Sequence, residues 1–299
     1  MASAVEEKVI DIEKDHFFDS GSVNVDGSVL KCWKAGGHGD QTFMQVLQNS
    51  CNPGFVKLGQ LLGKERLFSY IDKFGFGKKT GVDLNGEGEG IIFNLDKVGN
   101  VELSTTAFGQ GVSVTPIQQV AAVSAVVNGG YLNKPYIVKN IVDNDTNTVI
   151  KEYNKTPIRK VISNKTSAIM RYALESVVAK GGGKSAYIEG YRIGGKTGTA
   201  QKVKDGKYMV GNYIMSFMAV VPSNNPEAVL YLAIDNPKAF ADLVVIAKDA
   251  LNGKTYTPKK VVVKEEVKET KTTAKKAASE KKPAAKKTTT KSTKKTEEK

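Results

Sequence analysis

The segment Gly194–Gln201 has the clearest chemical content, because it places the amine of Lys196 beside the hydroxyls of Thr197 and Thr199. Side chains of an extended strand alternate between faces, so the two threonines share one face while Lys196 and Gly198 share the other. Gly198 lacks a Cβ, which favours the close approach of another backbone or of a ligand. A carboxylate-bearing, peptide-like ligand could therefore bind along this strand edge. Taken alone, however, a Lys-Thr-Gly triplet is more often a glycine-rich hairpin end with an incidental lysine.

A second Lys-Thr-Gly triplet, Lys79-Thr80-Gly81, tests how much the context adds. Glycine-rich loop sequence follows Lys79, so we discard it as a site residue. After Lys196 come a polar turn, Lys204–Lys207, and the apolar run Tyr213–Val221. This order predicts a hairpin, with the Lys196 segment as an edge strand.

A second group of polar residues lies in Gln48-Asn49-Ser50-Cys51-Asn52-Pro53. Proline is favoured in the first turn of a helix, and apolar residues at helical spacing continue to Leu62. Ser50 and Asn52 would then lie at the mouth of that helix. Such a pair is usually a helix cap, so its catalytic interpretation depends on whether the fold brings it to Lys196.

The elements that must position these two segments follow from periodicity and from turn residues. Ser163–Lys180 is expected to be a helix ended by a flexible hinge of three glycines. The other expected elements are short strands within residues 16–34, a helix over 117–127, a strand over 228–234 and a helix over 239–251.

The net charge of +13 is mostly a property of the C-terminal end. Fifteen lysines and six glutamates lie in residues 259–299, so residues 1–258 carry a net charge of only +4. We expect residues 256–299 to be a disordered tail that is either a solubilising extension or a contact for an anionic polymer or membrane surface. The charge of the folded part therefore does not predict nucleic acid as a partner. No stretch has the length of a spanning helix, and Met1–Ile10 lacks the features of a signal peptide.

The chain has two cysteines, Cys32 and Cys51, and two histidines as thiol and imidazole metal ligands. Their spacing matches no zinc motif, so the sequence predicts no metal and no cofactor. His38 lies in the glycine-rich Gly36–Gly39, where a structural role is favoured over that of a general base.

With these segments in order, the chain resembles the transpeptidase domain of class B penicillin-binding proteins, and within that class their sporulation-specific form. Further segments that carry the resemblance are Cys32-Trp33-Lys34 with Gly36-Gly37-His38-Gly39, Phe74-Gly75-Phe76-Gly77, and Phe108-Gly109-Gln110-Gly111 with Thr115-Pro116. The resemblance implies an α+β fold for residues 1–255, a mainly antiparallel sheet between helical layers. It also implies peptidoglycan D,D-transpeptidase activity through an acyl-serine, β-lactam binding, and a role in spore cortex or cell-wall synthesis.

The resemblance assigns a role to each site residue. Ser50 would relay a proton to the leaving group, Asn52 would hold the substrate amide, and Lys196 would supply positive potential. Thr197 and Thr199 would bind the carboxylate of a stem peptide or a β-lactam, and a backbone N–H after Gly198 would join the oxyanion hole. It also implies a cell-wall polymerase as partner and a location on the extracytoplasmic face of the membrane.

The chain departs from the family in the nucleophile motif, Ser-x-x-Lys. Ser28-Val29-Leu30-Lys31 fits the pattern but lies only 22 residues before Ser50, and Ser279 and Ser292 lie in the tail. We therefore expect an incomplete domain that is inactive without an upstream nucleophile, which leaves enzyme activity of this chain open. The alternative is a non-catalytic module that binds peptidoglycan or a partner. A second departure is Lys238–Asp242, which replaces the Gly-Gly and Ala-Pro pairs of the family.

Cys51 lies between Ser50 and Asn52, so a Cys32–Cys51 disulfide would restrict this motif and make activity depend on reduction. Two unpaired thiols are an equally supported alternative.

Overall fold

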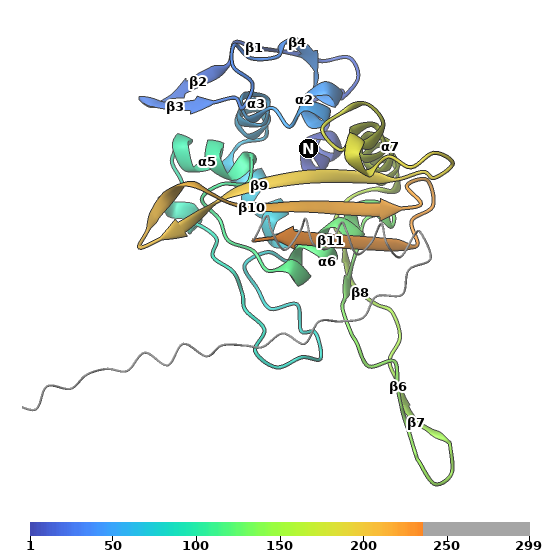
Figure 1. Cartoon of the computed structure of the whole chain (residues 1–299). Helices are drawn as coiled ribbons and strands as arrows, with labels where there is room; N and C mark the ends of the chain where they lie inside the picture. The colour runs from blue at the N-terminus through green and yellow to red at the C-terminus, as the bar shows by residue number, and fades with distance from the viewer. Residues whose placement is uncertain (236–299) are drawn as a thin grey trace, which may run out of the picture. The chain divides into compact units, whose positions relative to one another are not determined.

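A computed structural model describes residues 1–235 (Figure 1). The helices are α1 (Ala2–Glu6), α2 (Phe43–Asn49), α3 (Asn52–Leu62), α4 (Lys64–Lys73), α5 (Asn100–Ala107), α6 (Pro116–Val127) and α7 (Asn164–Lys180), with 3-10 turns η1 (Leu95–Lys97) and η2 (Lys184–Ala186). The strands are β1 (His16–Asp19), β2 (Ser22–Val25), β3 (Ser28–Lys31), β4 (Gly39–Thr42), β5 (Tyr131–Lys134), β6 (Asn140–Val142), β7 (Val149–Glu152), β8 (Thr156–Lys160), β9 (Gly194–Lys204), β10 (Lys207–Val221) and β11 (Ala228–Ile234). The mixed α+β class expected from the sequence is confirmed.

The largest sheet is antiparallel, with strand order β11-β10-β9, so β9 is an edge strand as predicted. Asp205 and Gly206 connect β9 to β10, and both have positive φ, +51° and +73°. A two-residue turn of this kind matches the twist of the strands it joins, and Asp-Gly is one of the pairs that adopt it readily. The register shifts between Tyr208 and Tyr213, and beyond this irregularity Lys196 lies opposite Met218.

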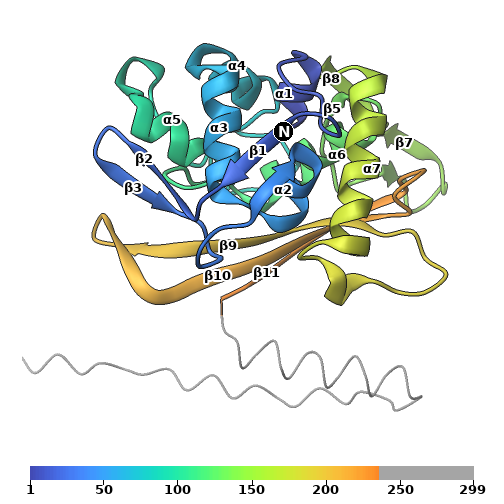
Figure 2. The same cartoon turned by 90° about the horizontal axis from the view of Figure 1, so that it is seen from above.

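The helices of the described residues lie to one side of this sheet and along its β9 edge (Figures 1 and 2). Val127 of α6, Leu174 of α7 and Val220 of β10 form a buried cluster that fixes both helices against the sheet. The second helical layer was predicted over residues 239–251, which lie outside the described residues, as does the predicted tail. No helix within residues 1–235 combines the length and apolarity needed to cross a bilayer.

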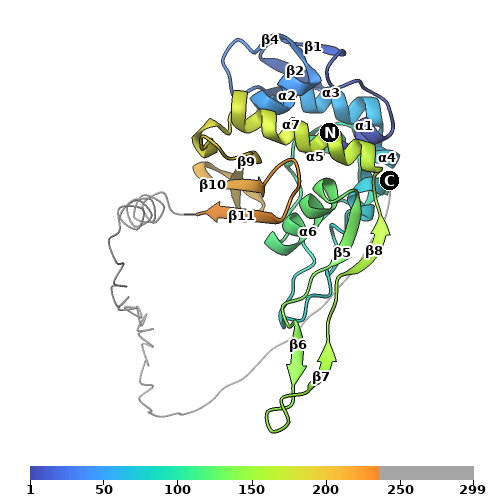
Figure 3. The same cartoon turned by 90° about the vertical axis from the view of Figure 1, so that its right-hand side faces the viewer.

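The main core lies between α1, α2, α3 and α7, and Val46, Cys51 and Ala173 are fully buried in it. A second cluster joins α4 and α6 to β5 through Tyr70, Ala125 and Leu132, among others. Outside both clusters, β6 and β7 form a hairpin that extends away from the three-stranded sheet (Figure 3). The predicted helices near 53–62, 117–127 and 163–180 are confirmed to within two residues.

The end of α2 has an unusual backbone at Ser50. The N–H of Cys51 donates to the Val46 carbonyl at 3.1 Å, and the N–H of Ser50 donates to the Leu47 carbonyl at 3.3 Å. These are the two bonds of a Schellman motif, in which the left-handed residue is usually glycine. Here that residue is Ser50, with φ +51° and ψ +45°. A side chain in this conformation costs about 1 kcal/mol or more, which points to a role for the hydroxyl.

The end of α2 and the start of α3 form a corner at Ser50. The glycines after α7 pack against the α2 side of this corner. The N–H of Gly182 donates to the Gln48 carbonyl at 2.9 Å. A Cβ on Gly181 would lie 2.6 Å from that carbonyl oxygen and 2.9 Å from the Gln48 Cα. The expected flexible hinge is therefore a close contact that ties the end of α7 to the last turn of α2, and glycine is needed there for space.

Gly181→Ala should lower the unfolding free energy by about 1–3 kcal/mol, because the new methyl group overlaps backbone atoms that have no free path to move. Urea unfolding followed by circular dichroism measures this change. Gly182→Ala is the matched control, since its Cβ would meet the same carbonyl oxygen at 3.7 Å, an ordinary contact. Equal stability of the two variants would contradict the packing described here.

Candidate active site

The structure brings the two polar segments together. Lys196 of β9 donates from Nζ to the Ser50 hydroxyl at 2.7 Å and to its neighbour's carbonyl, that of Thr197, at 2.8 Å. Ser50 lies between α2 and α3, two helices on the same side of the three-stranded sheet (Figure 2). A lysine and a serine 146 residues apart in the chain thus share one hydrogen bond.

The electrostatic state of Lys196 follows from its burial. Desolvation disfavours its cationic form and lowers the pKa of the amine to about 8. Within residues 1–235 the amine forms no ion pair with a carboxylate and donates only to neutral oxygens. A lysine with this pKa is able to exchange a proton with a hydroxyl close to neutral pH, which suits a proton relay.

The residues after Lys196 continue the β9 edge. Thr197 is half-buried and pairs with Phe217, whereas Thr199 is exposed and pairs with Met215. Gly198 pairs with Ser216, and a Cβ on Gly198 would lie 2.5 Å from the Ser216 hydroxyl. The close approach expected at Gly198 is therefore made by a side chain of the neighbouring strand.

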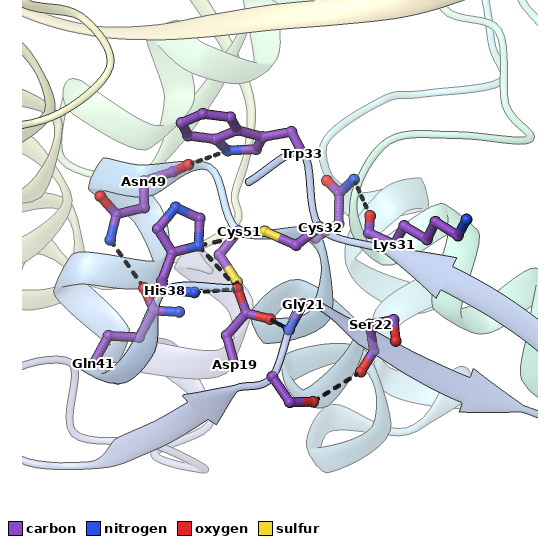
Figure 4. Close-up of polar contacts among 12 residues, drawn as sticks. Asp19, Gly21, Ser22, Lys31, Cys32, Trp33, His38, Gln41, Asn49 and Cys51 are labelled. Carbon is purple, nitrogen blue, oxygen red and sulfur yellow. Dashed lines mark hydrogen bonds and ion pairs between the residues drawn. The ribbon is translucent and has the colours of Figure 1, made fainter. Parts of the chain in front are cut away.

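Asn52 is the first residue of α3, so it lies next to the strained serine. Its side-chain amide donates to the carbonyl of Lys31, at the end of β3, at 3.2 Å. Nearby, the indole N–H of Trp33 donates to the Asn49 carbonyl at 2.8 Å (Figure 4). The end of β3 is therefore bonded to both helices that meet at Ser50.

A buried polar cluster lies behind this corner, and the sequence did not predict it as a group. Nδ1 of His38 lies 2.9 Å from Oδ2 of Asp19 and 3.3 Å from Sγ of Cys32. Sγ of Cys51 lies 3.3 Å from the same Asp19 oxygen (Figure 4). The structural role expected for His38 in its glycine-rich turn agrees with these contacts. Asp19 carried no signal in the sequence, since it is an isolated acid at the end of a short strand.

Hydrogen bonds stabilise the charged carboxylate of Asp19 in this cluster. Burial alone would raise the pKa of Asp19, but hydrogen bonds from His38, Cys32, Gly21 and Cys51 hold it well below its usual value. Burial, together with the adjacent carboxylate, raises the pKa of Cys51 to about 12. The Cys51 thiol is therefore protonated at neutral pH and is a poor nucleophile in this arrangement.

The two cysteines are free thiols in the structure, with sulfur atoms no more than 4.8 Å apart. The Cys32–Cys51 disulfide stays a prediction. A bridge would require the sulfurs to approach to about 2.05 Å.

The two other sequence matches, Ser28-Val29-Leu30-Lys31 and Lys79-Thr80-Gly81, lie elsewhere. Ser28 and Lys31 belong to the β2–β3 hairpin, where Lys31 is exposed. The backbone N–H groups of Thr80 and Gly81 donate to the Glu87 carboxylate, which holds the second Lys-Thr-Gly in a loop. Neither motif reaches Lys196.

An antiparallel sheet with helices beside it, and a lysine on the edge strand that bonds a Ser-x-Asn serine, define the class of penicillin-binding transpeptidase domains. The chain belongs to this family, since the model of the penicillin binding protein transpeptidase domain matches residues 1–252. The expected similarity to the sporulation-specific form is also confirmed. The chain is 60% identical over 238 residues to stage V sporulation protein D of Bacillus subtilis, a match that covers 80% of this chain and 37% of the relative.

Two further comparisons agree with this assignment. A peptidoglycan D,D-transpeptidase FtsI homolog of Mesostigma viride is 32% identical over 260 residues, covering 79% of this chain and 43% of that protein. Penicillin binding protein 3 of Mycobacterium tuberculosis, solved in complex with aztreonam, superposes with a TM-score of 0.74 at 27% identity, covering 86% of this chain and 62% of that one. The chain thus spans less than half the length of both curated relatives.

The burial of Lys196 predicts a pH-dependent stability. Its pKa is about 8 in the folded protein, below the ordinary value of 10.5, so the unfolded chain binds more protons between these two pH values. The unfolding free energy of the wild type should therefore rise relative to that of Lys196→Met as the pH goes from 8 to about 10. Urea unfolding of both proteins at several pH values measures the difference. A difference that stays constant or falls over this range would contradict the buried state of the amine.

Proposed function

We propose that this chain carries the proton-relay and carboxylate-binding part of a peptidoglycan D,D-transpeptidase active site. The observation that carries the proposal is the 2.7 Å hydrogen bond between Lys196 and Ser50. It joins a cation of lowered pKa to a hydroxyl held in a strained conformation, beside the edge strand β9. The names of the relatives support the same reaction.

The relay works through protons that these residues can supply. When a peptide bond to the terminal residue of a stem peptide breaks, the departing amine needs a proton. Ser50 donates its hydroxyl proton to that amine and takes one from the Lys196 ammonium, which becomes neutral. With a pKa of about 8, Lys196 loses that proton at little cost and recovers it from solvent.

The β9 edge provides the binding surface for the substrate. A stem peptide aligned with the strand would place its terminal carboxylate against the hydroxyls of Thr197 and Thr199, with the Lys196 charge nearby. Asn52 would hold a substrate amide from the opposite side. A β-lactam presents a carboxylate next to a reactive amide, so the same contacts would bind it, in line with the aztreonam complex of the Mycobacterium protein.

Covalent catalysis needs a nucleophile in addition to this relay. Within residues 1–235, Ser50 is the serine that bonds Lys196, and it plays the part of the relay rather than of the attacking group. Ser28 is held in the β2–β3 hairpin instead. We therefore propose that acyl transfer requires a Ser-x-x-Lys serine additional to the described residues.

Labelling with a fluorescent penicillin tests the assignment. The chain as given should not label, whereas a chain extended upstream to include the Ser-x-x-Lys motif of the family should. In the extended chain, Lys196→Met should slow labelling by about 100-fold or more, because the relay loses its cation. Lys79→Met, in the other Lys-Thr-Gly triplet, is the matched control and should label like the wild type. Labelling of the unextended chain would show that the nucleophile lies within it, and equal effects of the two lysine variants would remove Lys196 from the site.

We also propose that the domain functions on the extracytoplasmic face of the membrane, because peptidoglycan stem peptides are cross-linked there. Protease treatment of intact protoplasts should digest the domain in the full-length protein. A domain that survives this treatment and is digested only after lysis would contradict the location.

A further inference from the structure

Helix α7 contacts both halves of the candidate active site. Ala173 and Val177 of α7 belong to the main core with α2, whereas Leu174 belongs to the buried cluster on the sheet. The helix packs against both α2 and β9 and lies between them in Figure 3. Ser50 caps α2 and Lys196 belongs to β9, so this one helix is able to set the distance between the two residues.

The C-terminal part of α7 is bonded to the Ser50 side of the site. The N–H of Gly182, just after the helix, donates to the carbonyl of Gln48, which lies two residues before Ser50. One turn earlier, the hydroxyl of Ser176 lies 3.2 Å from the sulfur of Met44 in α2. These contacts fix the last turns of α2 relative to α7.

An ion pair bonds the same helix to the segment that leads into β9. Nε and Nη2 of Arg192 donate to the two carboxylate oxygens of Glu175, in α7, at 3.0 and 2.8 Å. The Ser223 hydroxyl donates to one of these oxygens at 2.7 Å, and the Ser223 N–H donates to the Arg192 carbonyl at 2.8 Å. The arginine holds the pKa of the Glu175 carboxyl below its usual value, so this group is a carboxylate at neutral pH.

Close packing continues from this ion pair towards Lys196. A Cβ on Gly194, the first residue of β9, would lie 3.3 Å from the Cβ atoms of both Leu174 and Ser223. Ser223 itself is fully buried. An isolated surface ion pair contributes little to stability, but a two-pronged pair that also bonds a buried hydroxyl fixes the direction of its partners. The strand therefore starts in a defined place against α7, two residues before Lys196.

We infer that Glu175 is a positioning residue of this site. By bonding Arg192 and Ser223 it holds the start of β9 against α7, so that the Lys196 amine reaches the Ser50 hydroxyl. Glu175 acts through the strand and is not itself bonded to Ser50 or Lys196. The geometric effect needs no enzyme activity, whereas its benefit to proton transfer rests on the proposed function.

The pKa of Lys196 tests this inference, and NMR titration of the lysine side chains in the full chain measures it, with Lys196→Met to assign the signal. In Glu175→Gln the start of β9 is released and water reaches the amine, so its pKa should rise from about 8 to about 9, towards the ordinary 10.5. Loss of the negative charge alone would act in the opposite direction, because a carboxylate favours the ammonium form. A rise therefore reports a movement of Lys196.

Tyr70→Phe is the matched control for a general loss of stability. It removes a 2.7 Å hydrogen bond from a buried tyrosine to Glu7, and neither residue belongs to α7 or β9. The pKa of Lys196 should stay at about 8 in this variant. Reversing the pair, with Glu175→Arg and Arg192→Glu together, should bring the pKa back towards that of the wild type.

Ser223→Ala gives a second test without any change of charge. It removes one hydrogen bond to Glu175 and should raise the pKa of Lys196 by less than Glu175→Gln does. Circular dichroism checks that each variant is folded. A Lys196 pKa that stays the same or falls in both Glu175→Gln and Ser223→Ala would overturn the inference, as would an equal rise in Tyr70→Phe.

Labelling by fluorescent penicillin separates this inference from the proposed function. In the chain extended upstream, Glu175→Gln should slow labelling at saturating penicillin by about tenfold or more, because the relay is misplaced. Unchanged labelling would overturn the positioning role of Glu175. An extended wild type that does not label would overturn the proposed function alone, since the comparison of pKa values requires no activity.

Discussion

The hydrogen bond between Lys196 and Ser50 is the contact on which the arrangement of the site depends. It joins the edge of the three-stranded sheet to the corner between α2 and α3. The two residues are 146 positions apart in the sequence. Both partners are in unfavourable states. The lysine is desolvated, which lowers its pKa, and the serine has a backbone conformation that favours glycine. Costs of this kind are common at functional sites, where the surrounding structure must hold the strained group in place.

Three sets of contacts provide that support, and each reaches the corner from a different direction. Gly182 bonds the Gln48 carbonyl from the end of α7, and Trp33 bonds the Asn49 carbonyl from the end of β3. Behind the corner, Cys51 packs in the main core and points its thiol at Asp19. These contacts restrict the backbone of Ser50 and oppose its change to a conformation of lower energy.

Local sequence signals predicted the elements on which the site is built, and chain topology decided the rest. The Asp-Gly turn predicted the β9–β10 hairpin, and Pro53 marked the start of α3, because both signals act over a few residues. The role of Gly181 was not predictable, since its reason is a backbone carbonyl more than a hundred residues away. The sequence also did not predict the cluster around Asp19, because its members come from separate turns of the chain. Only the fold brings them together.

A double-mutant cycle on the Ser50–Lys196 pair tests the central claim most directly. The unfolding free energies of the wild type, Ser50→Ala, Lys196→Met and the double variant give the coupling between the two side chains. A hydrogen bond from a partly buried cation to a hydroxyl predicts a coupling of about 1 kcal/mol or more. A coupling indistinguishable from zero would show that the two residues do not meet in solution, and the site described here would then not exist.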